Sequence, residues 1–135
     1  MDVEWCATSP ETGRYTGIGA PSPAGELVDR LEALRRVGEG YLEVNVLGRD
    51  YPVLSLGFRG DHAVLHRWAD EEHMALLGGD GSVPMDDVVE VPIAEDEFPG
   101  MFTGEFTSTT DRALGLVRRF LEDGDSESLG DWYDL

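Results

Sequence analysis

The 135-residue sequence contains no lysine, no glutamine and a single cysteine, Cys6. One thiol cannot form a disulfide within the chain, and the sequence does not open with a basic stretch followed by an apolar run, so we expect a cytoplasmic protein. Windows of roughly 18 consecutive apolar residues, which a membrane-spanning helix requires, are also lacking. We therefore expect no association with a membrane.

Arginine, which supplies all ten basic residues, is missing from two long stretches. From Asp70 to Asp111 there are twelve acidic residues without an arginine, and from Phe120 to Leu135 there are six more. The remaining residues hold ten acids and ten arginines, so these two acidic segments carry the whole net charge of -18. The sequence therefore predicts a neutral scaffold that carries two acidic segments.

This charge distribution limits the classes of partner. An acidic surface repels the phosphates of nucleic acids and anionic membranes, and it accelerates association with cationic partners. We therefore exclude nucleic acid and membrane and expect a protein partner with a basic surface. The alternative interpretation is that the acids serve solubility alone, or reflect the composition of a whole proteome.

The chain has enough apolar material to bury a core, since 41% of its residues are apolar and 9% aromatic. Its length predicts a single domain that spans residues 1–135. We expect residues 1–25 to form an N-terminal strand and a loop rich in glycine and proline, and residues 26–135 to form a sheet with helices. The predicted fold is α+β, with an antiparallel sheet of about five strands and two helices packed on it.

Capping residues and apolar periodicity predict the two helices. The first spans about residues 23–37, with Ser22 as its N-cap and Gly38 as its stop. The second spans residues 110–123, begins at a threonine cap and ends at Gly124. Its apolar residues cover a broad arc of its circumference, which predicts that it packs against the sheet.

Alternation of apolar and polar residues predicts most of the strands. Residues 53–58 and 63–68 are joined by the tight-turn sequence Arg-Gly-Asp-His, so they are expected to form a hairpin. Further strands are predicted at residues 1–6, at a sheet edge, and at residues 41–47, 88–93 and 129–135, whereas residues 69–77 fit a short helix or an irregular segment and residues 98–106 a loop or short strand.

The residues that could carry catalysis form no recognised pattern. His62 and His66 would lie about 13 Å apart on one strand, which is too far to share a zinc ion. His73 beside Asp70 is the remaining candidate for a metal site. The glycine-rich segment 79–81 holds an aspartate and no serine nucleophile. We therefore expect no enzymatic activity, no metal and no cofactor.

The runs of adjacent carboxylates instead favour a binding surface. They lack the alternating spacing of a calcium loop and the contrasting burial that a catalytic carboxylate pair needs. Carboxylates interleaved with large apolar side chains are typical of interfaces that bind arginine and lysine. The predicted partner-binding residues are Asp70, Glu71, Glu72, Asp80, Asp86, Asp87, Glu95, Asp96 and Glu97, with Trp68 and Phe98 as apolar anchors.

The order of the predicted elements resembles a known family. The hairpin of residues 53–68, the strand near residues 88–91, the helix that ends at Gly124 and the closing Trp132 follow one another within residues 41–132. Together with the helix-ending Phe120-Leu121, this order is similar to the first-numbered immunity protein family of bacterial polymorphic toxin systems.

The resemblance implies a cytoplasmic protein that binds and inhibits a cognate toxin, a nucleic-acid deaminase or a nuclease. The acidic charge of the chain adds an independent link, because a toxin that acts on nucleic acid must present a basic groove. An acidic protein can occupy that groove in place of phosphates and so block the substrate site. The alternative function is an acidic adaptor or a subunit of a larger assembly.

Overall fold

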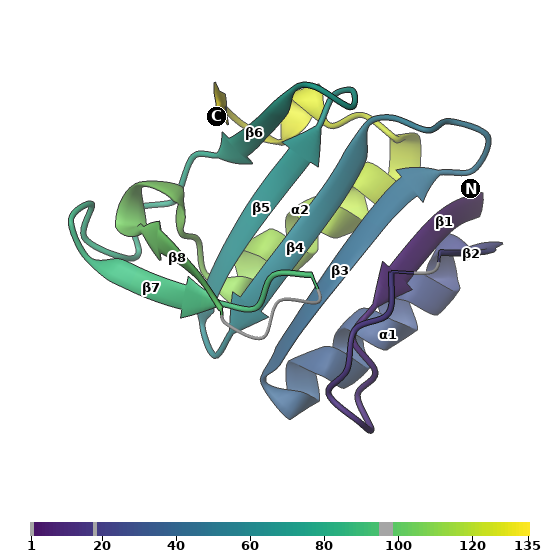
Figure 1. Ribbon diagram of the computed structural model, residues 1–135, viewed down its shortest axis with the longest axis horizontal. Helices are drawn as coiled ribbons and strands as arrows, with labels where there is room; N and C mark the ends of the chain where they lie inside the picture. The colour runs from purple at the N-terminus through teal and green to yellow at the C-terminus, as the bar shows by residue number, and fades with distance from the viewer. Residues whose placement is uncertain (1, 18, 95–98) are drawn as a thin grey trace.

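A computed structural model describes residues 2–17, 19–94 and 99–135 (Figure 1). Within these ranges, seven antiparallel strands form the main sheet, two more form a small second sheet, and two helices lie on one face of the main sheet. The elements are β1 (Asp2–Ala7), β2 (Ala20–Pro23), α1 (Ala24–Val37), β3 (Glu39–Val46), β4 (Val53–Arg59), β5 (His62–Trp68), β6 (Met74–Leu77), β7 (Val88–Val91), β8 (Gly100–Thr103), α2 (Thr110–Asp123) and β9 (Trp132–Asp134), with short 3-10 helices at Gly104–Phe106 and Glu127–Leu129.

The main sheet has the strand order β2-β1-β3-β4-β5-β6-β9, and β7 pairs with β8. The predicted α+β class, the antiparallel sheet and the two packed helices are confirmed. The main sheet is larger than the five strands predicted. One reason is that β2 and β6 are only four residues long and lie where the sequence shows no clear alternation.

The N-terminal strand is not an edge strand, contrary to prediction, because β1 pairs with both β2 and β3. Strand β2 lies in the segment that was expected to be a loop. It contains Pro21 and Pro23, which lack a backbone N–H, so it can pair on one side only and lies at the sheet edge.

The start of α1 also differs from the prediction that Ser22 caps it. The Ser22 hydroxyl accepts a hydrogen bond from Trp5 Nε1 at 2.6 Å and donates one to the carbonyl of Pro23. Pro23 occupies the N-cap position without a side-chain hydrogen bond. The predicted stop at Gly38 is confirmed, since this residue has a φ of 100°, in the left-handed region that favours glycine.

The predicted hairpin is confirmed. Strands β4 and β5 pair from Val53 opposite Trp68 to Arg59 opposite His62, and the connecting turn places Gly60 at a φ of 59°. The alternation of β4 turns Leu54, Leu56 and Phe58 toward the helices, where each is fully buried, as predicted.

Helix α2 supplies much of the core. Thr109 caps it by accepting a hydrogen bond from the Arg112 N–H at 3.3 Å, and Gly124 ends it with a φ of 72°. Its buried side chains join those of α1 and the main sheet in one apolar cluster. The α2 side chains in the core are Ala113, Leu114, Leu116, Val117, Phe120 and Leu121.

No helix in the described ranges combines the length and the apolar character that crossing a membrane requires.

The opposite face of the main sheet is only partly covered. Strand β7 packs against β4 and β5, and the chain beyond it passes over Gly57. A Cβ atom at this position would lie 2.3 Å from the carbonyl oxygen of Pro92. Because Gly57 has no side chain, residues 92–94 can cross the sheet closely, and among the described residues no ribbon covers the upper part of β3, β4 and β5 on this face, which we call the open face (Figure 1).

Candidate functional site

The predicted residues Asp70, Glu71 and Glu72 lie exposed in the turn between β5 and β6. One oxygen of Asp70 accepts hydrogen bonds from the backbone N–H groups of Glu72 and His73, and the His73 ring nitrogen lies 2.8 Å away. The side-chain hydrogen bond with His73 is the main cause that lowers the pKa of Asp70. Asp70 therefore shapes the turn, whereas the carboxylates of Glu71 and Glu72 have no partner among the described residues.

Asp80, another predicted binding residue, has a structural contact. Its carboxylate accepts hydrogen bonds from the N–H groups of Ser82 at 2.9 Å and Thr109 at 3.0 Å. Burial acts to raise the pKa of Asp80, but these hydrogen bonds, with Arg112 nearby, outweigh it and lower the pKa. The residue therefore ties the loop after β6 to the start of α2 while its side chain stays near the surface.

The predicted pair Asp86 and Asp87 lies exposed just before β7. The exposed apolar residues Met85 and Val88 flank this pair in the chain, and Met101 lies farther along, opposite Glu90 in the β7–β8 ladder. Met85 is 66% exposed and Met101, which pairs with Glu90, is 70% exposed. We call this surface the hairpin patch, and it consists of Met85, Asp86, Asp87, Val88, Glu90 and Met101.

The structure joins the two acidic segments that the sequence separates. Strand β9 pairs with β6, so that Ala75 lies opposite Asp134 and Leu77 opposite Trp132. The backbone N–H of Gly78 donates to the carbonyl of Asp131 at 2.9 Å, which extends the contact. Carboxylates from both segments therefore follow one edge of the sheet. We call this surface the acidic edge, and it consists of Asp70, Glu71, Glu72, Asp80, Asp131 and Asp134.

Arg67, on strand β5, forms its charged and aromatic contacts within the protein. It is 8% exposed, and its guanidinium lies 2.6 Å from the Glu127 carboxylate and 4.7 Å from the centre of the Trp132 ring. The indole N–H of Trp132 donates to the carbonyl of Ser126 at 2.9 Å. These contacts fix the chain that leads into β9, and the Arg67 charge is balanced by Glu127. Arg67 therefore forms no ion pair with the carboxylates of the acidic edge.

Trp68, the predicted apolar anchor, does not lie among the exposed acids. It is half-buried on the open sheet face, where its ring stacks on His66 with centroids 6.2 Å apart. Phe102 meets the same His66 ring edge-on at 5.3 Å. A pocket of about 250 Å³ opens here, lined by Tyr41, Glu43, His66, Trp68, Met74, Ile93, Ala94 and Phe102.

The period of two in β3 and β5 places the polar groups of this pocket on one face. Glu43 lies opposite Ser55, and Ser55 lies opposite His66, so these three side chains form a row across adjacent strands. Strand alternation in the sequence was the signal that could have shown this row. The row is not among the predicted site residues, because nothing in the sequence indicates which face of the sheet stays open.

The row does not make a nucleophilic centre. Ser55 is fully buried, and no hydrogen bond joins its hydroxyl to the His66 ring in the described part of the chain, so it does not contact His66 as a nucleophile would contact its base. Burial lowers the pKa of His66 to about 4 and leaves the ring neutral at pH 7. Burial likewise raises the pKa of the Cys6 thiol, which disfavours the reactive thiolate.

Glu43 is held by its neighbours at the wall of the pocket. The Tyr41 hydroxyl donates to one carboxylate oxygen at 2.8 Å, and the Cys6 thiol lies 4.0 Å from the other. The same thiol lies 2.9 Å from the Tyr15 hydroxyl. Burial, followed by the negative charge of Glu43, raises the pKa of Tyr41, so the phenol stays protonated and donates. This network holds the Glu43 carboxylate at the wall of a pocket that His66, Trp68 and Phe102 also line.

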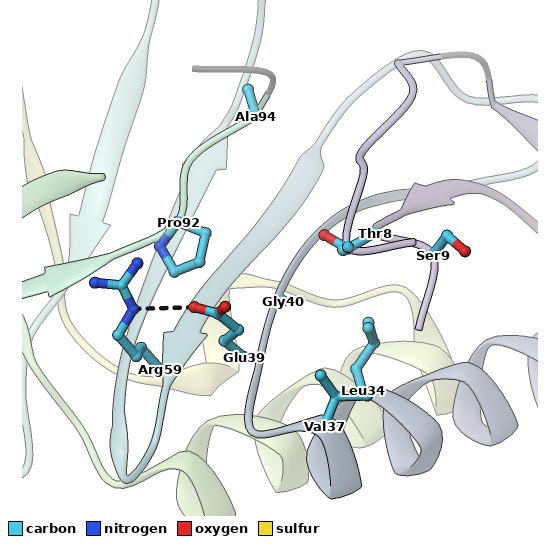
Figure 2. Close-up of a pocket in the computed structure, with 10 residues that line it drawn as sticks. Thr8, Ser9, Leu34, Val37, Glu39, Gly40, Arg59, Pro92 and Ala94 are labelled. Atoms are coloured by element: carbon cyan, nitrogen blue, oxygen red, sulfur yellow. Dashed lines mark hydrogen bonds and ion pairs between the residues drawn. The ribbon is translucent and has the colours of Figure 1, made fainter. Parts of the chain in front are cut away.

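A second pocket, of about 200 Å³, lies on the other side of residues 92–94 and is drawn in Figure 2. Its charged groups already have partners, because Arg59 Nε lies 3.0 Å from the Glu39 carboxylate and Nη1 lies 3.7 Å from that of Glu90. Figure 2 shows Arg59 and Glu39 pointing toward one another beside Pro92. The pocket therefore offers a ligand no unpaired charge.

Four predicted residues, Glu95, Asp96, Glu97 and Phe98, lie outside the described residues. Among all the residues that the structure describes, no group of three or more histidine, cysteine, aspartate or glutamate side chains is arranged to hold a metal ion. The ring nitrogen Nδ1 of His73, the candidate ligand, lies 2.8 Å from the Asp70 carboxylate within the turn.

Comparison with known proteins adds no family to this geometry. No model of a protein family matches the chain, and a search of curated proteins finds no match. The resemblance to immunity proteins stays a prediction that rests on the order of the elements.

Proposed function

We propose that the protein is an immunity protein that binds a cognate toxin and blocks its substrate site, acting in the cytoplasm without catalysis of its own. The observation that carries the proposal is the pairing of β6 with β9, which aligns carboxylates of both acidic segments along one edge. The toxin that fits this surface is a nucleic-acid deaminase or nuclease, because such an enzyme presents a basic groove to phosphates.

The state of the carboxylates supports binding to a cation. Within the described ranges, Glu71, Glu72, Asp131 and Asp134 are exposed and form no ion pair. Like charges that lie close together repel one another in the free protein, and a basic partner removes that repulsion. The same charges steer the partner toward this edge before contact, which raises the association rate more than the final affinity.

The hairpin patch supplies the apolar contacts that charge alone does not. Met85, Val88 and Met101 are each at least 60% exposed, and Asp86 and Asp87 lie beside them. Interfaces combine buried apolar anchors with a charged rim. We therefore place the toxin across the acidic edge and the hairpin patch, with Asp86 and Asp87 at the rim.

The test is the association of the protein with the toxin encoded beside its gene. Reversal of Glu71, Glu72 and Asp134 to arginine is expected to slow association about tenfold or more at low salt, and much less at high salt, because salt screens exposed charges. The rate is measured by stopped-flow mixing, and toxin activity is assayed on its nucleic-acid substrate in parallel.

The matched control reverses Glu11, Glu26 and Asp29, which are exposed acids outside both acidic segments, and gives the same change in net charge. Equal slowing by both triple variants would show that only the total charge matters and would contradict the placement. Tight binding that leaves the toxin fully active would contradict inhibition and favour the acidic adaptor.

A further inference from the structure

The pocket lined by Glu43, His66 and Trp68 contains a negative charge that no described residue balances. Glu43 is half-buried, and no arginine or histidine forms an ion pair with it in the described part of the chain. Its carboxylate contacts the Tyr41 hydroxyl at 2.8 Å and the Cys6 thiol at 4.0 Å, both of which are neutral. His66, which lines the same pocket, is neutral at pH 7 because burial lowers its pKa to about 4.

The walls around this carboxylate are suited to an organic cation. Trp68, His66 and Phe102 form an aromatic cluster, and Met74 and Ile93 add apolar surface. An aromatic ring attracts a cation through its negatively charged face, and tryptophan does so best. A ligand with an apolar stem and a guanidinium or ammonium head would therefore meet aromatic walls and a carboxylate in one pocket.

The size of the pocket sets the size of the ligand. Its volume of about 250 Å³ is below the roughly 300–1,000 Å³ of clefts that hold drug-sized molecules. One arginine or lysine side chain, or a free small amine of similar length, matches this volume. A nucleotide or a dinucleotide cofactor does not.

We propose that the pocket lined by Tyr41, Glu43, His66 and Trp68 binds a guanidinium or ammonium group, with Glu43 as its counterion. Such a group has two sources, a free small molecule or a basic side chain of the protein partner. The pocket itself is inferred without reference to the acidic edge, and only the second source rests on the proposed function.

The experiment is a titration of the isotope-labelled protein with Nα-acetyl-arginine amide, followed by the NMR signals of the Trp68 indole and of residues 66–68. We expect saturable shifts with the arginine amide and much weaker binding of Nα-acetyl-citrulline amide, which has the same shape without the charge. Glu43→Gln is expected to weaken arginine amide binding about tenfold, since it removes a charge-assisted contact.

Glu43→Gln retains an oxygen for the Tyr41 hydroxyl, so the fold is expected to persist. The matched control is Glu26→Gln, an exposed carboxylate on α1, which should bind the arginine amide like the wild type. Trp68→Leu is a second variant that removes the aromatic wall and should also weaken binding. Absence of saturable shifts, or equal binding of the arginine and citrulline amides, would overturn the proposal and leave the proposed function standing.

Binding of Glu43→Gln to the toxin distinguishes the two sources. A loss of toxin affinity together with the loss of arginine amide binding assigns the pocket to a side chain of the partner. Unchanged toxin affinity with the same loss of arginine amide binding assigns it to a free small cation. Both results support the ligand chemistry, whereas unchanged arginine amide binding by Glu43→Gln would contradict the role of the carboxylate.

Discussion

Gly57 lets two layers of backbone approach each other on the open face of the sheet. Any side chain here would collide with the Pro92 carbonyl, since even a Cβ atom would lie 2.3 Å from that oxygen. The Pro92 oxygen and Gly57 both belong to the backbone, so no side-chain rotation can relieve this clash. Gly57→Ala is therefore expected to lower the free energy of unfolding by about 1–3 kcal/mol, measured by denaturant titration.

Gly115 provides the matched control for this substitution. It lies exposed within α2, and a Cβ atom there would meet nothing within 4 Å. Gly115→Ala is expected to raise the free energy of unfolding by about 0.5–1 kcal/mol, because alanine loses less backbone entropy in a helix. If Gly57→Ala proved as harmless as Gly115→Ala, the close crossing at Pro92 would be wrong.

His66 makes the stability of the fold depend on pH. Burial lowers its pKa from 6.5 to about 4 in the folded protein, so between these values the unfolded chain binds a proton that the folded chain does not. The contribution of the neutral His66 ring to the free energy of unfolding is therefore fully present above pH 6.5. It is lost as the pH decreases toward 4, by about 3 kcal/mol at most.

The direct measurement is the NMR titration of the His66 ring, with an expected midpoint near pH 4. His66→Phe removes the titrating group but keeps an aromatic ring, so its stability should fall less steeply between pH 6.5 and 4. A midpoint above pH 6, or an unchanged slope in the variant, would show that the ring is open to water.

Strand β9 depends on one side chain at the level of the element. It is only three residues long, and Trp132 attaches it through the stack with Arg67, the hydrogen bond to Ser126 and packing against the main core. Trp132→Ala is expected to cost about 2–4 kcal/mol, somewhat less than for a fully buried tryptophan. Hydrogen exchange of β6 should also accelerate, because its partner strand is released.

Trp132→Phe separates the causes of this effect. It keeps the aromatic packing and removes only the indole N–H, so it should cost about 1 kcal/mol and leave exchange in β6 nearly unchanged. Slow exchange of Leu76 and Gly78, whose N–H groups face β9, in Trp132→Ala would mean that β9 holds its place without the tryptophan.

The elements with regular patterns could be predicted from the sequence, and the short ones could not. Strands β3 and β4 carry apolar residues at alternate positions, β5 follows a tight-turn sequence after β4, and α2 has both a cap and a glycine stop. By contrast, β2 contains two prolines, and β6 has the unbroken apolar sequence Met-Ala-Leu-Leu. Their pairing is decided by contacts with distant strands, which no local pattern reports.

For the candidate site as well, the features that depend on local sequence could be predicted and those that depend on long-range contacts could not. The exposure of Asp86 and Asp87 followed from the local composition, because runs of carboxylates stay in water. The acidic edge required the long-range pairing of β6 with β9, and the pocket required the placement of residues 92–94 over Gly57. Trp68 was identified as a large apolar contact residue, but the sequence did not show that it faces a pocket and not the acids.

At the scale of the whole molecule, the charge divides the protein into two parts. The α1 and α2 helices and the central strands contain most of the arginines, and four of these form ion pairs that join separate elements, namely Arg35, Arg59, Arg67 and Arg118. The carboxylates of the acidic edge lie at the far side of the sheet from β1 and β2. This separation predicts a directed approach of a basic partner.

Hydrogen exchange of the free protein and of its complex with the toxin encoded beside its gene tests the binding surface most directly. We predict slower exchange on binding in residues 69–73, in β9 and at the start of β7, with little change in α1. Protection confined to α1 and α2, with the acidic edge exchanging as fast as in the free protein, would contradict this prediction.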